Sequence, residues 1–375
     1  MSQPHTSFFA QPKFIVGNRA MDHIPTELDG YNAKRPMVLT NPQEKKLFFR
    51  HFRNALAESN ITIVALYTDI PNYVNINEVK RLAGLYKWRQ CDSIISLGGS
   101  VILDTAKALA IEVSEGNVLS KMEIETPLPP LVYIATPQVD GFEVTDSVNI
   151  DGKRHHSPFL YPEIVCIDSK TAVSKEAEKE VIYASLDSLA HCIEGASKEP
   201  NNPFADASAF TAIRLIAHNL PIFAKRPKNQ KAALALLNGI AVAGTVRSNT
   251  NGGLACLSAE VIANQTGYPQ GMISGFLLPL ALKHKQKFNY SIREDLLLSL
   301  YGIDNFCSTP KEKRIEEAIR FLEDMSQALS KYLPKNLKDL NLQEHLLSKI
   351  SHMVETKSES RISAEECANF LKTAY

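Results

Sequence analysis

The stretch CDSIISLGGSVILDTAKALA, Cys91 to Ala110, passes from a strand pattern to a helix pattern through two glycines. Asp92 to Leu97 is a short β-branched run, and apolar residues recur at helical spacing from about Ile102. A glycine turn that leads into a helix N-terminus directs backbone amides and the positive end of the helix dipole toward a phosphate. A tight strand-to-helix turn without a ligand is the alternative interpretation of the same residues.

Further strand patterns lie on both sides of this stretch, between Phe14 and Asp168. The runs PMVLT, ITIVALY, LVYIAT and EIVCID alternate with amphipathic helical segments such as NINEVKRLAGLYKWRQ. Strands that alternate with helices predict βαβ units around a mainly parallel sheet. We therefore expect residues 1–168 to form an α/β domain.

The strand patterns end after Asp168. Long helical patterns follow, from KEAEKEVIYASLDSLAHCIEGAS to the final SAEECANFLKTAY. A chain of 375 residues is also longer than one typical core requires. We therefore expect residues 169–375 to form a separate all-α domain.

The composition restricts the kinds of partner. Lys plus Arg and Asp plus Glu are equal at 41 each, so no net charge steers the protein toward nucleic acid or an anionic membrane. The longest apolar run, GMISGFLLPLAL, is too short to span a bilayer, and the first residues do not resemble a signal peptide. Six cysteines without paired spacing are typical of reduced thiols. We expect a cytoplasmic protein with a small-molecule substrate.

The glycine stretch resembles the G-G-G-S-x-x-D-x-A-K loop of the iron-containing alcohol dehydrogenases, within the dehydroquinate synthase-like superfamily. Ser100 stands in place of the third glycine, and Val101 in place of the serine. In the family this loop holds the pyrophosphate of a nicotinamide dinucleotide, so the resemblance implies a dinucleotide-binding domain. The matching residues are Gly98, Gly99, Asp104, Ala106 and Lys107.

Three other segments extend the resemblance toward the cofactor. Asn41 stands where the family often has an acid that grips the adenosine ribose, and an asparagine leaves both NAD and NADP open as cofactor. IATPQVDGFEVT resembles I-P-T-T-A-G-T-G-S-E-V-T; it keeps Thr136 and differs at Asp140 and Phe142. GKRHHSPF places Lys153 where dehydroquinate synthases have an anion-binding lysine, and an exposed hairpin lysine is the alternative.

The stretch YASLDSLAHCIEGAS carries three ionisable residues at helical spacing. Asp187 and His191 lie one turn apart, so they share a helix face and can meet one divalent ion. A hydrogen-bonded Asp–His pair inside a helix bundle is the alternative. The stretch resembles the family's D-A-L-x-H-x-x-E, which supplies the first two metal ligands, and Glu194 matches the final acid.

The family's other two ligands are histidines, in G-L-x-x-x-H-x-x-x-H and H-G-x-x-x-A-x-x-x-P. Cys256 and Gln270 occupy these two positions, and Glu260, which replaces the second histidine of the first motif, is the candidate catalytic residue. The implied metal ligands are Asp187, His191, Cys256 and Gln270, with zinc or iron as the metal. A thiolate favours zinc. A set with Glu260 in place of Gln270 would be a closed, structural site.

The resemblance implies NAD(P)-dependent hydride transfer between an alcohol and an aldehyde or ketone, with a divalent metal polarising the oxygen. It also implies a homodimer. Substitutions at Val101, Phe142, Cys256 and Gln270 support one alternative, a degenerate member that binds a nucleotide or metabolite without redox turnover. A cyclase similar to dehydroquinate synthase is the other alternative.

Overall fold

The computed structural model describes residues 8–9, 12–116, 124, 127–137, 139, 141, 143–151, 153–174, 177–196 and 202–375. The chain divides into two compact units. The sheet unit consists of Ala10–Glu180 and Lys228–Asn238. The helical unit consists of Met1–Phe9, Val181–Pro227 and Gly239–Tyr375.

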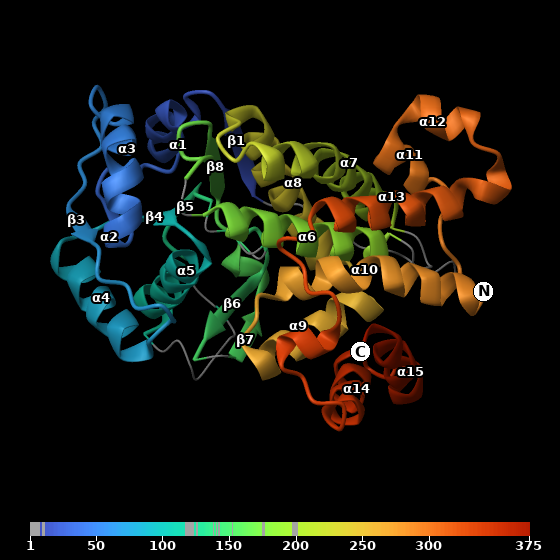
Figure 1. Cartoon of the computed structure of the whole chain (residues 1–375). Helices are drawn as coiled ribbons and strands as arrows, with labels where there is room; N and C mark the ends of the chain where they lie inside the picture. The colour runs from blue at the N-terminus through green and yellow to red at the C-terminus, as the bar shows by residue number, and fades with distance from the viewer. Residues whose placement is uncertain are drawn as a thin grey trace, which may run out of the picture. The chain divides into compact units, whose positions relative to one another are not determined.

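A parallel six-stranded sheet is the centre of the sheet unit (Figure 1). This architecture confirms the α/β fold expected from the sequence, and each expected strand run contains an observed strand. The strands, in spatial order, are β1 (Lys13–Gly17), β8 (Ile164–Asp168), β5 (Leu131–Ala135), β4 (Ser93–Gly98), β2 (Pro36–Leu39) and β3 (Ala65–Tyr67). A separate antiparallel pair consists of β6 (Ser147–Ile150) and β7 (Lys153–His156).

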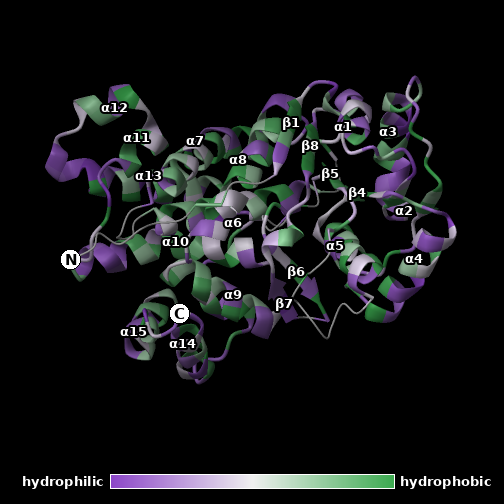
Figure 2. Ribbon diagram, turned by 180° about the vertical axis from the view of Figure 1, so that it is seen from behind, coloured by the Kyte–Doolittle hydropathy of each residue, from purple (hydrophilic) through white to green (hydrophobic). Residues whose placement is uncertain are grey.

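Helices cover both faces of this sheet, which explains why β4, β5 and β8 are buried along their whole length. Figure 2 shows β8 in the colour of hydrophobic residues. One face packs against η1 (Ala20–His23), α1 (Ile24–Gly30), η2 (Lys45–Phe49) and α3 (Arg50–Ala55). Helix α5 (Ser100–Glu115) packs against β4 and β5. It also shares a second hydrophobic cluster with α4 (Ile76–Trp88), β6 and η3 (Pro158–Leu160).

The order of the strands reverses beside β2. The chain leaves β2 for the edge strand β3 and returns through α4 to β4 on the other side of β2. The register pairs Leu39 with Ser96 and Gly98 with Ala135, so the carboxyl ends of these strands reach the same edge of the sheet. In doubly wound sheets a ligand crevice opens at this reversal, outside the carboxyl ends of the strands.

The glycine turn after β4 depends on the conformation of Gly98. Its φ is +150°, and a Cβ at this position would lie 2.2 Å from Cδ1 of Ile102. Gly99 then serves as the N-cap residue, and α5 begins at Ser100, two residues earlier than the sequence predicts. The backbone therefore enters the helix directly at the end of the strand.

Helices alone form the secondary structure after Asp168 in the described residues, as expected from the sequence. The helices α9, α10, α14 and α15 share one core with η5 (Leu337–Leu340). No helix in the described part of the chain has the length and apolar character needed to cross a membrane. The helices are α6 (Glu178–Gly195), α7 (Pro203–Lys225), α8 (Gln230–Asn249), α9 (Leu254–Thr266), α10 (Gln270–Lys287), α11 (Leu296–Tyr301), α12 (Ile303–Ser308), α13 (Arg314–Ala328), α14 (Leu346–Lys357) and α15 (Ala364–Ala374).

We expect Gly98→Ala to lower the free energy of unfolding by about 1–3 kcal/mol, because alanine is strained at this φ. Gly84→Ala is the matched control. Gly84 lies exposed in α4, and a Cβ added there would have no atom within 4 Å, so alanine should stabilise the helix by about 0.5–1 kcal/mol. Urea denaturation measures both changes, and equal stability of the two variants would contradict the strain argument.

Candidate functional site

A cavity of about 580 Å³ opens at the carboxyl ends of β2, β3 and β4 in the sheet unit. This is the edge where the strand order reverses, so the cavity lies where the topology predicts a ligand crevice. Its lining residues are Asn41, Pro42, Gln43, Ile70, Pro71, Asn72, Gly99, Ser100, Val101, Ile102, Val139 and Glu180.

The first turn of α5 lies along this cavity. Gly99, Ser100 and Val101 line it, and they precede or begin a helix of 16 residues. The first amide groups of a helix have no partner within the helix, and the dipole adds about half a positive charge at this end. The cavity therefore offers backbone donors and a positive potential to an anionic group.

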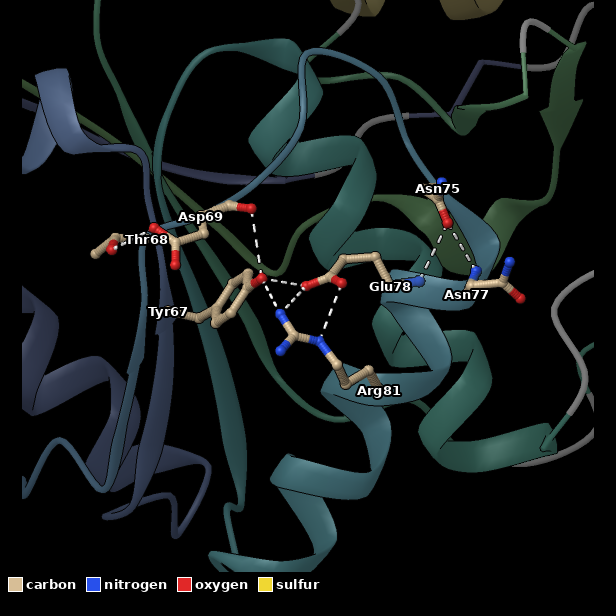
Figure 3. Close-up of polar contacts among 7 residues, drawn as sticks. All are labelled: Tyr67, Thr68, Asp69, Asn75, Asn77, Glu78 and Arg81. Carbon is tan, nitrogen blue, oxygen red and sulfur yellow. Dashed lines mark hydrogen bonds and ion pairs between the residues drawn. The ribbon is translucent and has the colours of Figure 1, made fainter.

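A polar cluster holds the β3–α4 connection that supplies another wall of the cavity (Figure 3). The Tyr67 hydroxyl contacts the Glu78 carboxylate and the Arg81 guanidinium, and Arg81 donates from Nε to Oε2 of Glu78 at 3.0 Å. Asn75 caps α4 by accepting from the amides of Asn77 and Glu78, at 2.9 and 3.2 Å. Burial raises the pKa of Tyr67 to about 12, so the phenol stays protonated.

A buried acid, Glu44, lies beside the glycine turn. Its side chain is 1% exposed, and Oε1 accepts a hydrogen bond from Oγ1 of Thr136 at 3.0 Å. No hydrogen-bond partner among the described residues reaches its other oxygen, Oε2. A Cβ on Gly98 would lie 3.5 Å from Cγ of this glutamate. Burial raises the pKa of Glu44 to about 7, so it takes up a proton near neutral pH.

Only some of the predicted cofactor-binding residues line the cavity. Asn41 lines it together with Gly99 and Ser100, but its Oδ1 accepts from the amide of Glu44 at 2.8 Å and so caps the short helix α2 (Pro42–Glu44). Gly98 forms the turn behind them. Asp140 and Phe142 lie outside the described residues.

The other predicted cofactor residues have structural contacts. Lys107 is 1% exposed and donates to the carbonyls of Thr145 at 2.9 Å and Ser147 at 2.8 Å, so it joins α5 to the start of β6. Asp104 accepts from the amide of Asn149 at 3.3 Å. Lys153 is exposed on β7. A direct role for these residues, or for Thr136, in holding a cofactor stays a prediction.

In the helical unit, the predicted metal ligand Asp187 is surrounded by protein donors. Oδ2 accepts from Nη2 of Arg247 at 2.9 Å, and Oδ1 accepts from Oγ of Ser274 at 2.6 Å. Nε2 of Gln270 lies 3.0 Å from Oδ1 and 3.2 Å from Oδ2. The side chains of Arg247 and Asp187 are 9% and 4% exposed, so this ion pair is buried.

This arrangement does not fit a divalent metal. A carboxylate only accepts hydrogen bonds, so Gln270 must turn its amide nitrogen toward Asp187 and cannot bind the same ion through that atom. A divalent ion about 4 Å from the Arg247 guanidinium would be repelled by roughly 8 kcal/mol at an effective dielectric constant of about 20. Among the residues that the structure describes, no three His, Cys, Asp or Glu side chains form a group able to hold a metal ion.

The remaining predicted ligands lie near this pair without forming a coordination site. Nε2 of His191 lies 3.2 Å from Oγ1 of Thr250. Cys256 is 3% exposed in the first turn of α9, and burial, with a further contribution from Glu194, raises the pKa of its thiol well above the usual value.

Glu194 and Glu260 have separate roles in the structure. Glu194 is fully buried and accepts from the amides of Gly253, Ala255 and Cys256 at 2.9–3.1 Å, so it caps the N-terminus of α9. Glu260 lies 2.9 Å from Nζ of Lys357 on α14, and its side chain is 25% exposed. A catalytic role for Glu260 stays a prediction.

Three side chains that shape these sites were not singled out in the sequence. Arg247 had a signal, because it is a lone cation in the largely apolar helical run GIAVAGTVRSN. Ser274 and Glu44 had none, since each lies among residues that are ordinary at a helix start or in an apolar helix.

Comparison with known proteins matches both parts of the chain to one family. The profile described as "Iron-containing alcohol dehydrogenase" matches residues 11–169, and "Fe-containing alcohol dehydrogenase family, C-terminal" matches residues 181–372. These matches confirm the resemblance found in the sequence.

The similar proteins span between three quarters and nearly all of the chain. The NAD-dependent methanol dehydrogenase of Bacillus methanolicus is 23% identical over 98% of this chain and 100% of the relative. The 1,3-propanediol dehydrogenase of Klebsiella pneumoniae is 26% identical over 77% of this chain and 76% of its own length. A crystal structure of a 1,3-propanediol oxidoreductase has the same fold, with a TM-score of 0.85 and 20% identity over 99% of this chain and 100% of its own.

We expect Glu44→Gln to stabilise the protein at pH 8 and to have a much smaller effect near pH 4.5. The pKa of Glu44 is about 7 in the folded protein against an ordinary 4.5, so the folded state binds more protons between these values and loses stability as the pH rises through this window. The gain at pH 8 should be on the order of 1–3 kcal/mol. Urea denaturation at both pH values measures it, with the exposed Glu58→Gln as the control for loss of one charge. A gain of the same size at both pH values would contradict this assignment.

We expect Arg247→Met to cost about 3–5 kcal/mol of stability, because Asp187 would keep a buried charge without its cation. The double variant Asp187→Asn/Arg247→Met should lose less than the sum of the two single changes. Lys357→Met, which removes the half-exposed partner of Glu260, should cost no more than about 1 kcal/mol. If the double variant lost as much stability as the two single variants together, Asp187 and Arg247 would not interact.

Proposed function

Because the chain belongs to the iron-containing alcohol dehydrogenase family, we propose that it transfers a hydride between NAD and a small alcohol or the corresponding aldehyde. The relatives named NAD-dependent methanol dehydrogenase and 1,3-propanediol dehydrogenase support NAD(P)-dependent oxidoreduction of an alcohol. The sheet unit is the proposed binding site of the dinucleotide.

The cavity at the reversal of strand order is the observation that carries this proposal. It combines the volume for a nucleotide with the N-terminal turn of α5, where Gly99, Ser100 and Val101 lie along its wall. A pyrophosphate bound there would accept hydrogen bonds from backbone amides and gain from the helix dipole. The polar cluster around Tyr67 and Arg81 holds the β3–α4 connection, which supplies another part of the lining (Figure 3).

The lining of the cavity favours NAD over NADP. No lysine or arginine belongs to its described lining, so a 2′-phosphate would find no cation there, and Glu180 adds a negative charge. The amide oxygen of Asn41 is occupied as the cap of α2. Its amide nitrogen is the group that we propose for the adenosine ribose.

The reaction needs no further reactant than NAD and the alcohol. The C–H bond at the carbinol carbon breaks, its electron pair and hydrogen pass to the nicotinamide ring, and the hydroxyl proton is released. In the reverse direction NADH and a proton reduce the aldehyde. We propose that the chain's own residues hold the cavity in shape. Lys107 does so by fixing α5 against the segment that follows β5.

A second candidate is a nucleotide-binding protein without redox turnover. The pairing of Asp187 with Arg247 favours it. Asp187 stands at a metal-ligand position of the family, and here it already binds a protein cation in place of the metal that would polarise the substrate oxygen. Binding of NADH without turnover of any alcohol or aldehyde would select this candidate.

The proposal includes a homodimer in a reducing compartment. The edge strand β1 exposes Phe14 and Val16, an apolar surface on a strand that pairs on one side only among the described residues. All six cysteines are free thiols, which a reducing compartment such as the cytoplasm preserves.

We expect NADH to bind at least about tenfold more tightly than NADPH, which corresponds to about 1.4 kcal/mol. Ser100→Asp should weaken NADH binding by at least about tenfold, because a carboxylate would repel the pyrophosphate while favouring the helix N-terminus. Ser100→Asn, of similar size and neutral, is the matched control. Titration of nicotinamide fluorescence measures the affinities, and equal binding by both variants would exclude this loop as the phosphate site.

A panel of short alcohols and aldehydes, followed by absorbance of NADH, tests the redox step itself. Ser100→Asp should lose turnover in proportion to its loss of cofactor binding. Turnover that Ser100→Asp leaves unchanged at low cofactor concentration would contradict the proposed site.

A further inference from the structure

We propose that Arg247 is the permanent cation of the helical unit and takes the place of the divalent metal, so that the folded protein binds no metal ion at Asp187. The proposal goes beyond the family's activity, because it concerns a property in which this chain departs from the iron-containing pattern.

Protein donors saturate both oxygen atoms of the Asp187 carboxylate. Arg247 contacts Oδ2, Ser274 contacts Oδ1, and Gln270 lies within hydrogen-bond distance of both. These donors come from α8 and α10, and each oxygen has two of them. A metal ion would have to displace at least one of these buried contacts to reach an oxygen atom.

The charges of Asp187 and Arg247 also oppose a metal ion. Arg247 is buried, and a buried guanidinium requires an anionic partner. Asp187 supplies this partner at 2.9 Å, so anion and cation balance within the helical unit. A second cation at the same carboxylate would leave an excess of positive charge in a buried site.

The residues at the family's other two ligand positions also oppose a metal ion at Asp187. The two positions at which the resembling family has histidine ligands carry Cys256 and Gln270. Of these, Gln270 faces Asp187 as a hydrogen-bond donor. Two ligand positions have therefore changed, and Arg247 contacts a further ligand of the family pattern, Asp187. Together these changes replace the metal ion by a guanidinium.

Where the proposed oxidoreduction holds, it follows that turnover needs no added metal and resists chelators. This consequence rests on the proposed function, whereas the metal content of the protein does not. Failure to turn over any alcohol would therefore count against the function and leave the metal-free assignment in place.

The test is the metal content of untagged protein, measured by plasma mass spectrometry after purification without chelator and again after incubation with excess zinc or ferrous iron and desalting. We expect well below one ion per chain in both samples, and no change in Tm on addition of zinc or of EDTA. One tightly held ion per chain in the wild-type protein would overturn the proposal.

Two variants assign the exclusion of metal to Arg247. Cys256→His/Gln270→His returns both imidazoles and keeps the arginine, and the triple variant adds Arg247→Ala. We expect the triple variant to bind one zinc ion per chain and to gain Tm with zinc, because a ligand that binds only the folded state stabilises it. The double variant should bind zinc at least about tenfold more weakly.

Equal zinc affinity of the double and triple variants would overturn the role of Arg247. A triple variant with the wild-type circular dichroism spectrum and no zinc uptake would overturn it as well. If the triple variant does not fold, the double variant still tests the role of Arg247, because one tightly held zinc ion per chain in a variant that keeps the arginine would overturn it.

Discussion

A carboxylate buried in the helical unit must be neutralised, and the structure does this with a protein cation. Asp187 on α6 is held by Arg247 from α8 and by Gln270 and Ser274 from α10. Two turns further along α6, Glu194 caps the first turn of α9. The acids of one helix therefore fix the positions of three others, and the buried ion pair is the point on which this packing depends.

The sheet unit depends on a different constraint. A parallel strand can reach its neighbour only through a crossover, and the reversal of these crossovers beside β2 leaves the carboxyl ends of β2, β3 and β4 uncovered. The glycine turn and the start of α5 occupy this edge, so the helix dipole points into the cavity. The polar contacts of Tyr67, Glu78 and Arg81 hold the connection from β3 to α4, which supplies another part of the cavity lining (Figure 3).

Each unit contains a buried acid, Asp187 in the helical unit and Glu44 in the sheet unit, and the surroundings of the two acids differ. The Asp187 carboxylate is paired with a guanidinium and accepts hydrogen bonds from two further donors. Glu44 has one hydrogen bond from Thr136 and no cation among the contacts that lower its pKa, so burial raises that pKa to about 7. Glu44 therefore carries less negative charge near neutral pH than an ordinary glutamate does, beside the loop where we propose that an anionic pyrophosphate binds.

The sequence by itself determined the order of the elements. Alternating β-branched and amphipathic runs predicted the parallel sheet, and the change of pattern after Asp168 predicted the helical part. The glycine pair predicted the strand-to-helix turn, of which Gly99 lines the cavity. These features are local, because periodicity and glycine content follow from neighbouring residues. The same spacing also placed Asp187 and His191 on one helix face.

Only the tertiary structure decided which groups these residues meet. Arg247 lies 60 residues from Asp187 and Ser274 lies 87, and no local pattern connects them. Likewise Lys107 and Thr136 match a cofactor motif in sequence, yet one is bonded to the carbonyls of Thr145 and Ser147 and the other to Glu44. A side chain's partner depends on how distant helices and strands pack, and on the cost of leaving a buried charge or donor unmatched, so it is fixed only when the whole unit has folded.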